Sequence, residues 1–329
     1  MERTIGITIL LWSPPTGDLK WPFPMGLVRS SGLSILNITT FRLIVLIAGL
    51  AVAGYYDWRT REVPDGIWIV MGAFGALFLL LGAYGDAPVV FVLDLVAALF
   101  VLEHFLPWDD RLEGHDTLTL LIEVAIYVGV VALSAYAYLF WNSVVLAHPE
   151  FLVVVVSVLI ARGLYELRML WGGADAKALM AAALLLPLFA QPLAVSYPST
   201  VSTVGLSYIP FSVTMLIDGA ILTLVIPIGL FIYNATKGFY GFPQAFNLYE
   251  IPTEELPHRF VWLRQPPLKT NNYLDTTEED NEMRKKQAEE LLAKGVDKVW
   301  VTPQIPMVTA LAVGAVAGLI VGNFLLWIL

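Results

Sequence analysis

Two aspartates stand where an acid could do chemistry at the edge of an apolar segment. Asp57 ends one apolar run and precedes a basic turn, and Asp175 follows two glycines between two apolar runs. Hydrolysis of a peptide bond by carboxyl groups needs two acids that share one proton, because one activates water while the other protonates the carbonyl oxygen or the leaving nitrogen. Asp57 and Asp175 are therefore a candidate catalytic pair.

Each aspartate belongs to a short motif. The first motif covers residues 57–65, and after Asp57 it contains Arg59, Arg61, Glu62, Pro64 and Asp65. The second covers residues 172–177, and around Asp175 it contains Gly172, Gly173, Ala174 and Lys177. Glycines at such a position allow backbone conformations closed to other residues and let helices approach closely. The second motif thus predicts a tight turn that delivers an acid to a helix start.

The elements that must position these motifs are apolar. Of the 329 residues, 57% are hydrophobic and 14% are charged, whereas a soluble domain has about 25% charged residues. Stretches long enough to cross about 30 Å of hydrocarbon recur along the chain, and only helices satisfy their own backbone there. We predict an all-α polytopic membrane protein of about eight transmembrane helices, at residues 41–57, 66–84, 88–106, 118–141, 151–170, 174–191, 211–233 and 305–329.

Basic residues predict the orientation of these helices. Apart from four before or at the start of the first span, the 19 Lys and Arg residues lie in or beside alternate connections. The positive-inside rule places such connections in the cytoplasm. We therefore expect a multi-pass protein of the plasma membrane with its N-terminus outside and both aspartates at the cytoplasmic face. The four early basic residues do not fit this pattern.

The same pattern divides the chain into four parts. Residues 1–40 are predicted as an extracytoplasmic tail, 41–233 as the catalytic helices, 234–303 as a cytoplasmic insert and 304–329 as the last transmembrane helix. Within the insert, a capping box of Thr276 and Glu279 predicts a charged helix that stops at Gly295, followed by a strand at 296–301. Residues 239–267, rich in proline and aromatics, should be irregular or short-stranded.

Several classes of function are disfavoured by composition. The absence of cysteine excludes disulfides, thiolate nucleophiles and cysteine-based zinc sites. The four histidines lack the spacing of metal ligands, so we expect neither a metal nor another cofactor. The net charge of -9 argues against a nucleic-acid partner. The lipid bilayer is the expected surrounding, and the oligomeric state stays open.

The two motifs resemble those of the archaeal preflagellin peptidases and type IV prepilin peptidases, which are GxGD-type membrane aspartyl proteases. Residues 57–65 are similar to the first catalytic motif of the family and residues 172–177 to the second, with Lys177 in its usual place and Ala174 replacing a glycine. Residues 299–306 are similar to the C-terminal part of archaeal members. The family usually has fewer spans, so we assign the surplus to a hairpin within residues 88–141.

This resemblance implies that Asp57 and Asp175 are catalytic and that the substrates are membrane proteins of the prepilin or preflagellin type. The enzyme would remove their short basic leader at the cytoplasmic face. Bacterial relatives also methylate the new N-terminus and often carry a zinc-binding cysteine cluster. Because this chain has no cysteine and no glycine-rich nucleotide loop, we expect protease activity alone.

The other polar residues can be explained by structural roles as well as by functional ones. Arg59, Arg61 and Lys177 are expected to be positive-inside anchors, although Lys177 would alternatively bias the ionisation of the pair. An acidic surface either attracts the basic leader or is a solvated loop; its residues are Glu62, Asp65, Asp109, Asp110, Glu113 and Asp116. Three acids inside apolar spans are expected to bond between helices: Asp94, Glu123 and Asp218. Gly314, Gly318 and Gly322 should allow close packing of the last span.

Two rival functions remain. One keeps the chemistry and changes the substrate, as in presenilin-like or signal-peptide-peptidase-like enzymes that cut within remnant transmembrane helices. The other is a proton-coupled secondary transporter whose membrane acids carry protons. Transport predicts inverted repeats with broken helices in corresponding halves, and none is visible in the sequence.

Overall fold

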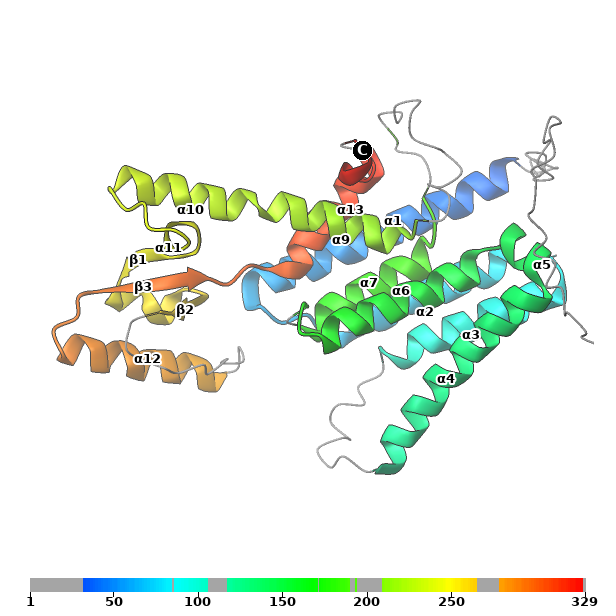
Figure 1. The fold of residues 1–329 in the computed structure, drawn as a ribbon, viewed down its shortest axis with the longest axis horizontal. Coiled ribbons are helices and arrows are strands. Elements are labelled where there is room, and N and C mark those ends of the chain that lie inside the picture. Colours follow the sequence, from blue (N-terminus) through cyan, green and yellow to red (C-terminus); the bar gives the residue numbers. More distant parts are fainter. Residues whose placement is uncertain are drawn as a thin grey trace, which may run out of the picture.

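The computed structural model describes residues 32–84, 86–105, 117–170, 172–189, 193, 209–264 and 278–327. The fold is mainly helical, with a small sheet beyond one end of a helix bundle (Figure 1). The bundle helices are α1 (Gly32–Thr60), α2 (Asp65–Gly82), α3 (Pro88–Glu103), α4 (Thr117–Phe140), α6 (Glu150–Glu166), α7 (Gly173–Leu185), α9 (Phe211–Thr223), α10 (Val225–Thr236) and α13 (Met307–Ile320). A short helix, α5 (Asn142–Ala147), joins α4 to α6.

The bundle identifies a helical membrane protein. Within the described residues, four stretches are long and apolar enough to cross a bilayer: Ile38–Thr60, Asp65–Gly82, Leu121–Phe140 and Phe211–Thr236. The last of these contains α9 and α10, which meet at Leu224. Large apolar side chains stay exposed along the outer faces of these helices, as expected for surfaces that contact lipid.

Helix α7 lies at the centre of the bundle and is buried along nearly its whole length. It packs against α2, α6, α9 and α1. The predicted span of 174–191 was too long, because the helix ends at Leu185. Pro187 explains the early end, since a proline pushes the residue before it out of the helical conformation. Leu188 then forms an isolated bridge with Pro210, just before α9.

Helices α9 and α13 approach each other through glycines. A Cβ added to Gly314 would lie 2.4 Å from the backbone nitrogen of Gly219 and the backbone oxygen of Met215. One on Gly318 would lie 2.9 Å from the Thr214 side chain. The expected packing role is confirmed for these two glycines. Gly322 differs: its φ of 86° belongs to the turn after α13, so the helix stops well short of the predicted 329.

The insert is a small mixed α/β unit, so the all-α prediction holds for the bundle alone. Strands β1 (Tyr249–Pro252), β3 (Lys298–Pro303) and β2 (Val261–Leu263) form an antiparallel sheet in that order. Helix α12 (Glu278–Ala293) packs on the 3-10 helix η2 (Thr253–His258), and a short helix α11 (Gln244–Asn247) precedes β1. A second core joins the sheet, η2 and α12, and it contains Ile251, Leu256, Val261, Ala288, Leu291, Val299 and Val301.

The predictions for the insert are largely confirmed. The charged helix stops before Gly295, whose φ of 75° is the left-handed conformation typical of a helix C-terminus. The predicted strand is β3, and the region before the helix is short-stranded. The predicted capping box lies outside the residues whose side chains are described. Strand β3 runs into α13 after three residues, so the insert is connected directly to the bundle (Figure 1).

Candidate active site

Asp57 lies in the last turn of α1 with its side chain turned into the protein. The residue is 7% exposed. Its Oδ2 accepts a hydrogen bond of 3.0 Å from the backbone N–H of Thr309. Thr309 is the third residue of α13, where N–H groups have no partner inside their own helix. The carboxyl group of one helix therefore caps the start of another.

The Thr309 side chain fastens the same two helices. Its Oγ1 donates to the backbone oxygen of Gly54 at 2.8 Å and also lies 3.4 Å from Asp57 Oδ2. A Cβ on Gly54 would lie 3.4 Å from Thr309 Cα, in van der Waals contact. Gly54 therefore lies at the contact between α1 and α13, beside the residue that bonds Asp57.

Asp175 is held by its own helix. It is the third residue of α7 and is 6% exposed. Its Oδ2 accepts a hydrogen bond of 3.2 Å from the N–H of Gly172, the residue that caps α7. A Cβ on Gly172 would already be 3.4 Å from that oxygen, whereas a Cβ on Gly173 would meet nothing within 4 Å. The two glycines of the motif therefore have different roles.

The two aspartates are 118 positions apart in the chain and lie on neighbouring helices of the bundle. Helix α1 packs against α7, and a negative charge on Asp57 acts on the carboxyl group of Asp175. Two buried acids whose negative charges oppose each other do not readily carry both charges, and such a pair favours a single shared proton. This arrangement is the one that acid–base hydrolysis requires.

A salt bridge ties the two motifs to each other. Lys177 Nζ lies 2.6 Å from Oδ1 of Asp65, the first residue of α2. Lys177 therefore anchors α7 to α2 in addition to any attraction to a membrane face. Asp65 likewise has an internal partner, which is a plainer role than contact with a substrate leader.

The remaining residues of the first motif shape the turn between α1 and α2. Arg61 has a φ of 63°, which ends α1, and its guanidinium lies 5.1 Å from the centre of the Phe260 ring in the insert. Pro64 precedes α2 as its capping residue. Arg59 and Glu62 are exposed. Asp109 and Asp110, like Glu113 and Asp116, lie outside the described residues, so most of the proposed acidic surface remains a prediction.

Ala174, in the second motif, packs against the hydrophobic core at the start of α7. Sequence reasoning missed three residues around the pair: Gly54, Phe260 and Thr309. Thr309 gave one usable signal, since it is a polar residue in the first turn of an apolar helix that follows Pro306.

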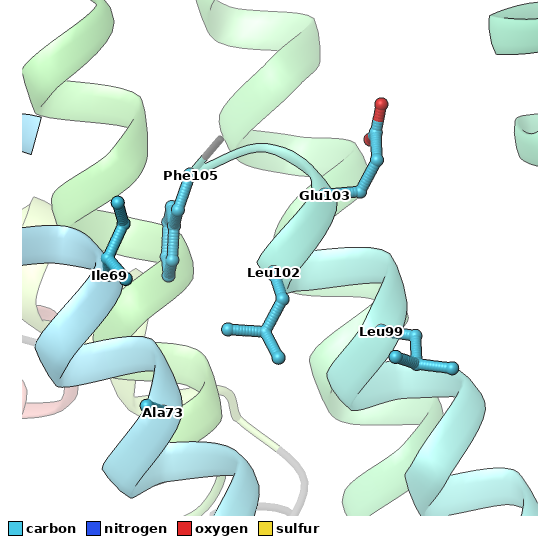
Figure 2. Close-up of a pocket in the computed structure, with 6 residues that line it drawn as sticks. All are labelled: Ile69, Ala73, Leu99, Leu102, Glu103 and Phe105. Carbon is cyan, nitrogen blue, oxygen red and sulfur yellow. The ribbon is translucent and has the colours of Figure 1, made fainter. Parts of the chain in front are cut away.

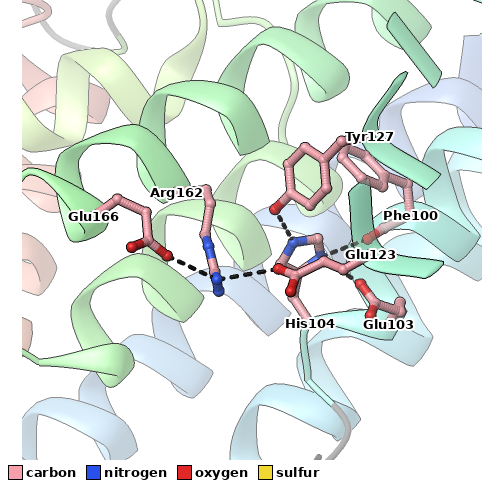
Figure 3. Close-up of polar contacts among 7 residues, drawn as sticks. All are labelled: Phe100, Glu103, His104, Glu123, Tyr127, Arg162 and Glu166. Carbon is pink, nitrogen blue, oxygen red and sulfur yellow. Dashed lines mark hydrogen bonds and ion pairs between the residues drawn. The ribbon is translucent and has the colours of Figure 1, made fainter. Parts of the chain in front are cut away.

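The other acids of the bundle have structural partners. Arg162 of α6 contacts Glu123 of α4 at 3.1 Å and Glu166 at 2.7 Å, which confirms the expected bond between helices (Figure 3). In the same cluster, His104 Nε2 lies 2.6 Å from the hydroxyl of Tyr127. Asp218 accepts a 2.8 Å hydrogen bond from the N–H of Phe324, so it holds the chain just after α13. Asp94 is buried, and the charges of Glu150 and Arg42 both act on it, so its expected bond between helices stays a prediction.

An apolar pocket of about 520 Å³ lies between α2 and α3, apart from the two motifs. Figure 2 shows Phe105 and Leu102 facing Ile69 and Ala73 across it, with Glu103 pointing away. Glu103 is the ionisable residue of this lining, and a single carboxyl group does not form an acid pair. In the described part of the chain, no three His, Asp or Glu residues gather where they could hold a metal ion.

Comparison with known proteins gives a relative without a known activity. No family model matches the chain. It is 29% identical over 261 residues to an uncharacterised protein of Methanocaldococcus jannaschii, and the match covers 76% of this chain and 80% of the relative. A chain of related sequence thus occurs in an archaeon, and inferences about function depend on the site itself.

Proposed function

We propose that the protein is a membrane-embedded aspartyl protease whose catalytic residues are Asp57 and Asp175. The observation that carries the proposal is the burial of two carboxyl groups on two helices that pack against each other, each with a hydrogen-bond donor on one oxygen. Burying an acid without a counter-ion is unfavourable, and acids within membrane proteins usually serve a function. The pair would activate water directly, without a metal.

We further propose the orientation predicted from the basic residues: about eight spans, the N-terminus outside, and the pair and the insert at the cytoplasmic face. The long helices and the alternation of Lys and Arg support it. Helices α3, α7 and α13 are shorter than a bilayer requires. For α7 this is acceptable, because non-helical backbone at membrane depth is tolerated where protein surrounds it.

The proposed substrates are membrane proteins with a short basic leader, as in prepilins and preflagellins. Support comes from the resemblance of residues 57–65 and 172–177 to the motifs of that family, and from the acidic surface that includes Glu62. The relative in an archaeon is consistent with membership in the archaeal branch of that peptidase family. A leader beside the bilayer has an extended backbone whose carbonyl groups are open to attack, unlike those of an intact helix.

The test is cleavage by purified protein in lipid nanodiscs. Two substrates are compared: a prepilin-like protein with its basic leader, and a transmembrane stub without one. We expect cleavage of the first alone, and loss of at least about a thousandfold in rate for Asp57→Asn and for Asp175→Asn. Preferred cleavage of the stub would favour a presenilin-like substrate instead.

Asp218→Asn is the matched control for these variants. Asp218 is equally buried, lies near the other end of α13, and an asparagine oxygen can still accept the bond from Phe324. We expect this variant to cleave like the original protein. Cleavage that survives in both pair variants would refute the protease and leave proton-coupled transport as the better account.

A further inference from the structure

The two carboxyl groups of the pair have unequal surroundings. Asp57 Oδ2 receives the N–H of Thr309 at 3.0 Å and has the Thr309 hydroxyl at 3.4 Å. The N–H of Val308 and the charge of Arg61 also act on this carboxyl group. The start of α13 thus points at Asp57, and helix N-termini stabilise negative charge. Asp175 also lies in the first turn of a helix, α7, so the two acids differ in the number of their donors and not in their access to a helix N-terminus.

Asp175 has fewer such groups. The single donor that the structure gives it is the N–H of Gly172, at the longer distance of 3.2 Å. Its burial is the same as that of Asp57 to within one percentage point, 6% against 7% exposed. The difference between the two therefore lies in their partners and not in their access to solvent.

The charges on the surrounding helices reinforce this asymmetry. Helix α13 carries no charged residue. The charged residue of α2 is Asp65, and its partner is Lys177 of α7, so these two largely neutralise each other. The remaining charged groups that face the pair are Arg61, after α1, and the two aspartates themselves. Arg61 acts on Asp57.

We propose that Thr309 is a positioning residue that holds Asp57 as the charged member of the pair, so that Asp57 is the base and Asp175 carries the shared proton. This inference rests on the proposed protease function. Asp57 takes a proton from water as the water oxygen bonds to the substrate carbonyl carbon, and Asp175 gives its proton to the carbonyl oxygen. The proton on Asp57 then passes to the nitrogen as the C–N bond breaks, and Asp175 regains its proton from the former carbonyl oxygen.

This assignment also gives the insert a role. The chain leaves β3 and enters α13, and the N–H of Gln304 between them donates to the backbone oxygen of Phe260 at 3.0 Å. The Phe260 ring in turn lies against the guanidinium of Arg61. The insert therefore fixes both groups that stabilise charge on Asp57, the first turn of α13 and Arg61.

Carbodiimide labelling tests the assignment without any cleavage. N,N′-dicyclohexylcarbodiimide reacts with buried carboxyl groups that carry a proton, and peptide mass spectrometry locates the adducts. In nanodiscs at neutral pH we expect several-fold more adduct on Asp175 than on Asp57. The variant T309V should raise the yield on Asp57, and T309S, which keeps the hydroxyl, should not. Equal or greater labelling of Asp57 in the original protein would overturn the assignment.

The pH dependence of leader cleavage is a second test, and it decides the matter if neither aspartate reacts with the probe. T309V keeps the backbone N–H but removes the hydroxyl, which bonds Gly54 and lies 3.4 Å from Asp57 Oδ2. Weaker donation to a carboxylate disfavours its charged form. In T309V the acid limb of the kcat/KM profile should move upward by about half a pH unit to one unit, with T309S like the original protein. A fall in rate without a shift would show a merely structural role. If the original protein cleaves nothing, the protease proposal fails, while labelling still reports on the pair.

Discussion

The two halves of the candidate site are built in opposite ways. Asp175 bonds to a backbone group three residues away, within the motif that contains it. Asp57 bonds to a residue 252 positions later, on a helix that the insert delivers. The Asp175 half of the site, which is Asp175 with Gly172, forms within one short motif. The Asp57 half, which is Asp57 with Thr309, forms only when α1, α13 and the insert are assembled. The comparison suggests that the Asp57 half is the one that distant changes can disable.

The variant with the largest expected effect displaces α13 and so disrupts the Asp57 half of the site. Gly314→Leu places a side chain where even a Cβ would lie 2.4 Å from the backbone of α9, so α13 must move away. Overpacking of this kind costs roughly 1–3 kcal/mol, occasionally more. We expect a lower unfolding temperature in nanodiscs and almost complete loss of leader cleavage.

Gly129→Leu is the control for this variant, because a Cβ at Gly129 of α4 would meet nothing within 4 Å. It should leave both measurements unchanged. If Gly314→Leu behaved like Gly129→Leu, the position of α13 would not depend on its close contact with α9. The Asp57 half would then be less sensitive to distant changes than we infer.

The contrast between a local half and a half built from distant residues also explains which parts of the site could be predicted from the sequence. Asp175, its glycines and the helix after them follow one another along the chain, so spacing alone suggested their arrangement. Helix α2 is also close to its predicted span of 66–84, because hydropathy reports long apolar helices well. Thr309 was missed because its partner is set by packing between distant helices, which no local pattern records.

Other differences have local causes that hydropathy does not register. A hydropathy average treats Pro187 and Gly322 as two polar interruptions among many apolar residues, yet each ends a helix. Strands β1 and β2 have four and three residues, too few for a visible alternation of polar and apolar side chains. They become strands because β3 lies between them and pairs with both.

A smaller effect is expected from a change beside Asp175, in the local half of the site. Gly172→Leu adds atoms beyond a Cβ that would already touch the Asp175 carboxyl group, whereas Gly173→Leu extends into open space. We expect kcat for leader cleavage to fall about tenfold to a hundredfold in the first variant, since small displacements of a catalytic group have effects of that size. The second should cleave normally.

The unfolding temperature distinguishes this effect from that of Gly314→Leu. Both Gly172→Leu and Gly173→Leu should unfold close to the original protein, because residue 172 is a capping position outside the packed core. Equal activity in the two variants would contradict the view that Gly172 supports Asp175. A marked loss of stability in Gly172→Leu would show that the local half also depends on wider packing.

The smallest expected effect concerns the salt bridge that joins the two halves. Lys177 and Asp65 are 2.6 Å apart, and their side chains are 17% and 41% exposed, so solvent weakens the attraction. A double-mutant cycle with Lys177→Met and Asp65→Asn should give a coupling of about 0.5–1 kcal/mol in stability that decreases at high salt. Cleavage should fall only a few-fold in each single variant, because Asp175 keeps its donor at Gly172 and Asp57 keeps Thr309.

Arg59→Met, at an exposed position of α1, should change neither measurement. Strict additivity at low salt would mean that the motifs meet without help from this pair, and that helix packing alone sets the distance between the aspartates.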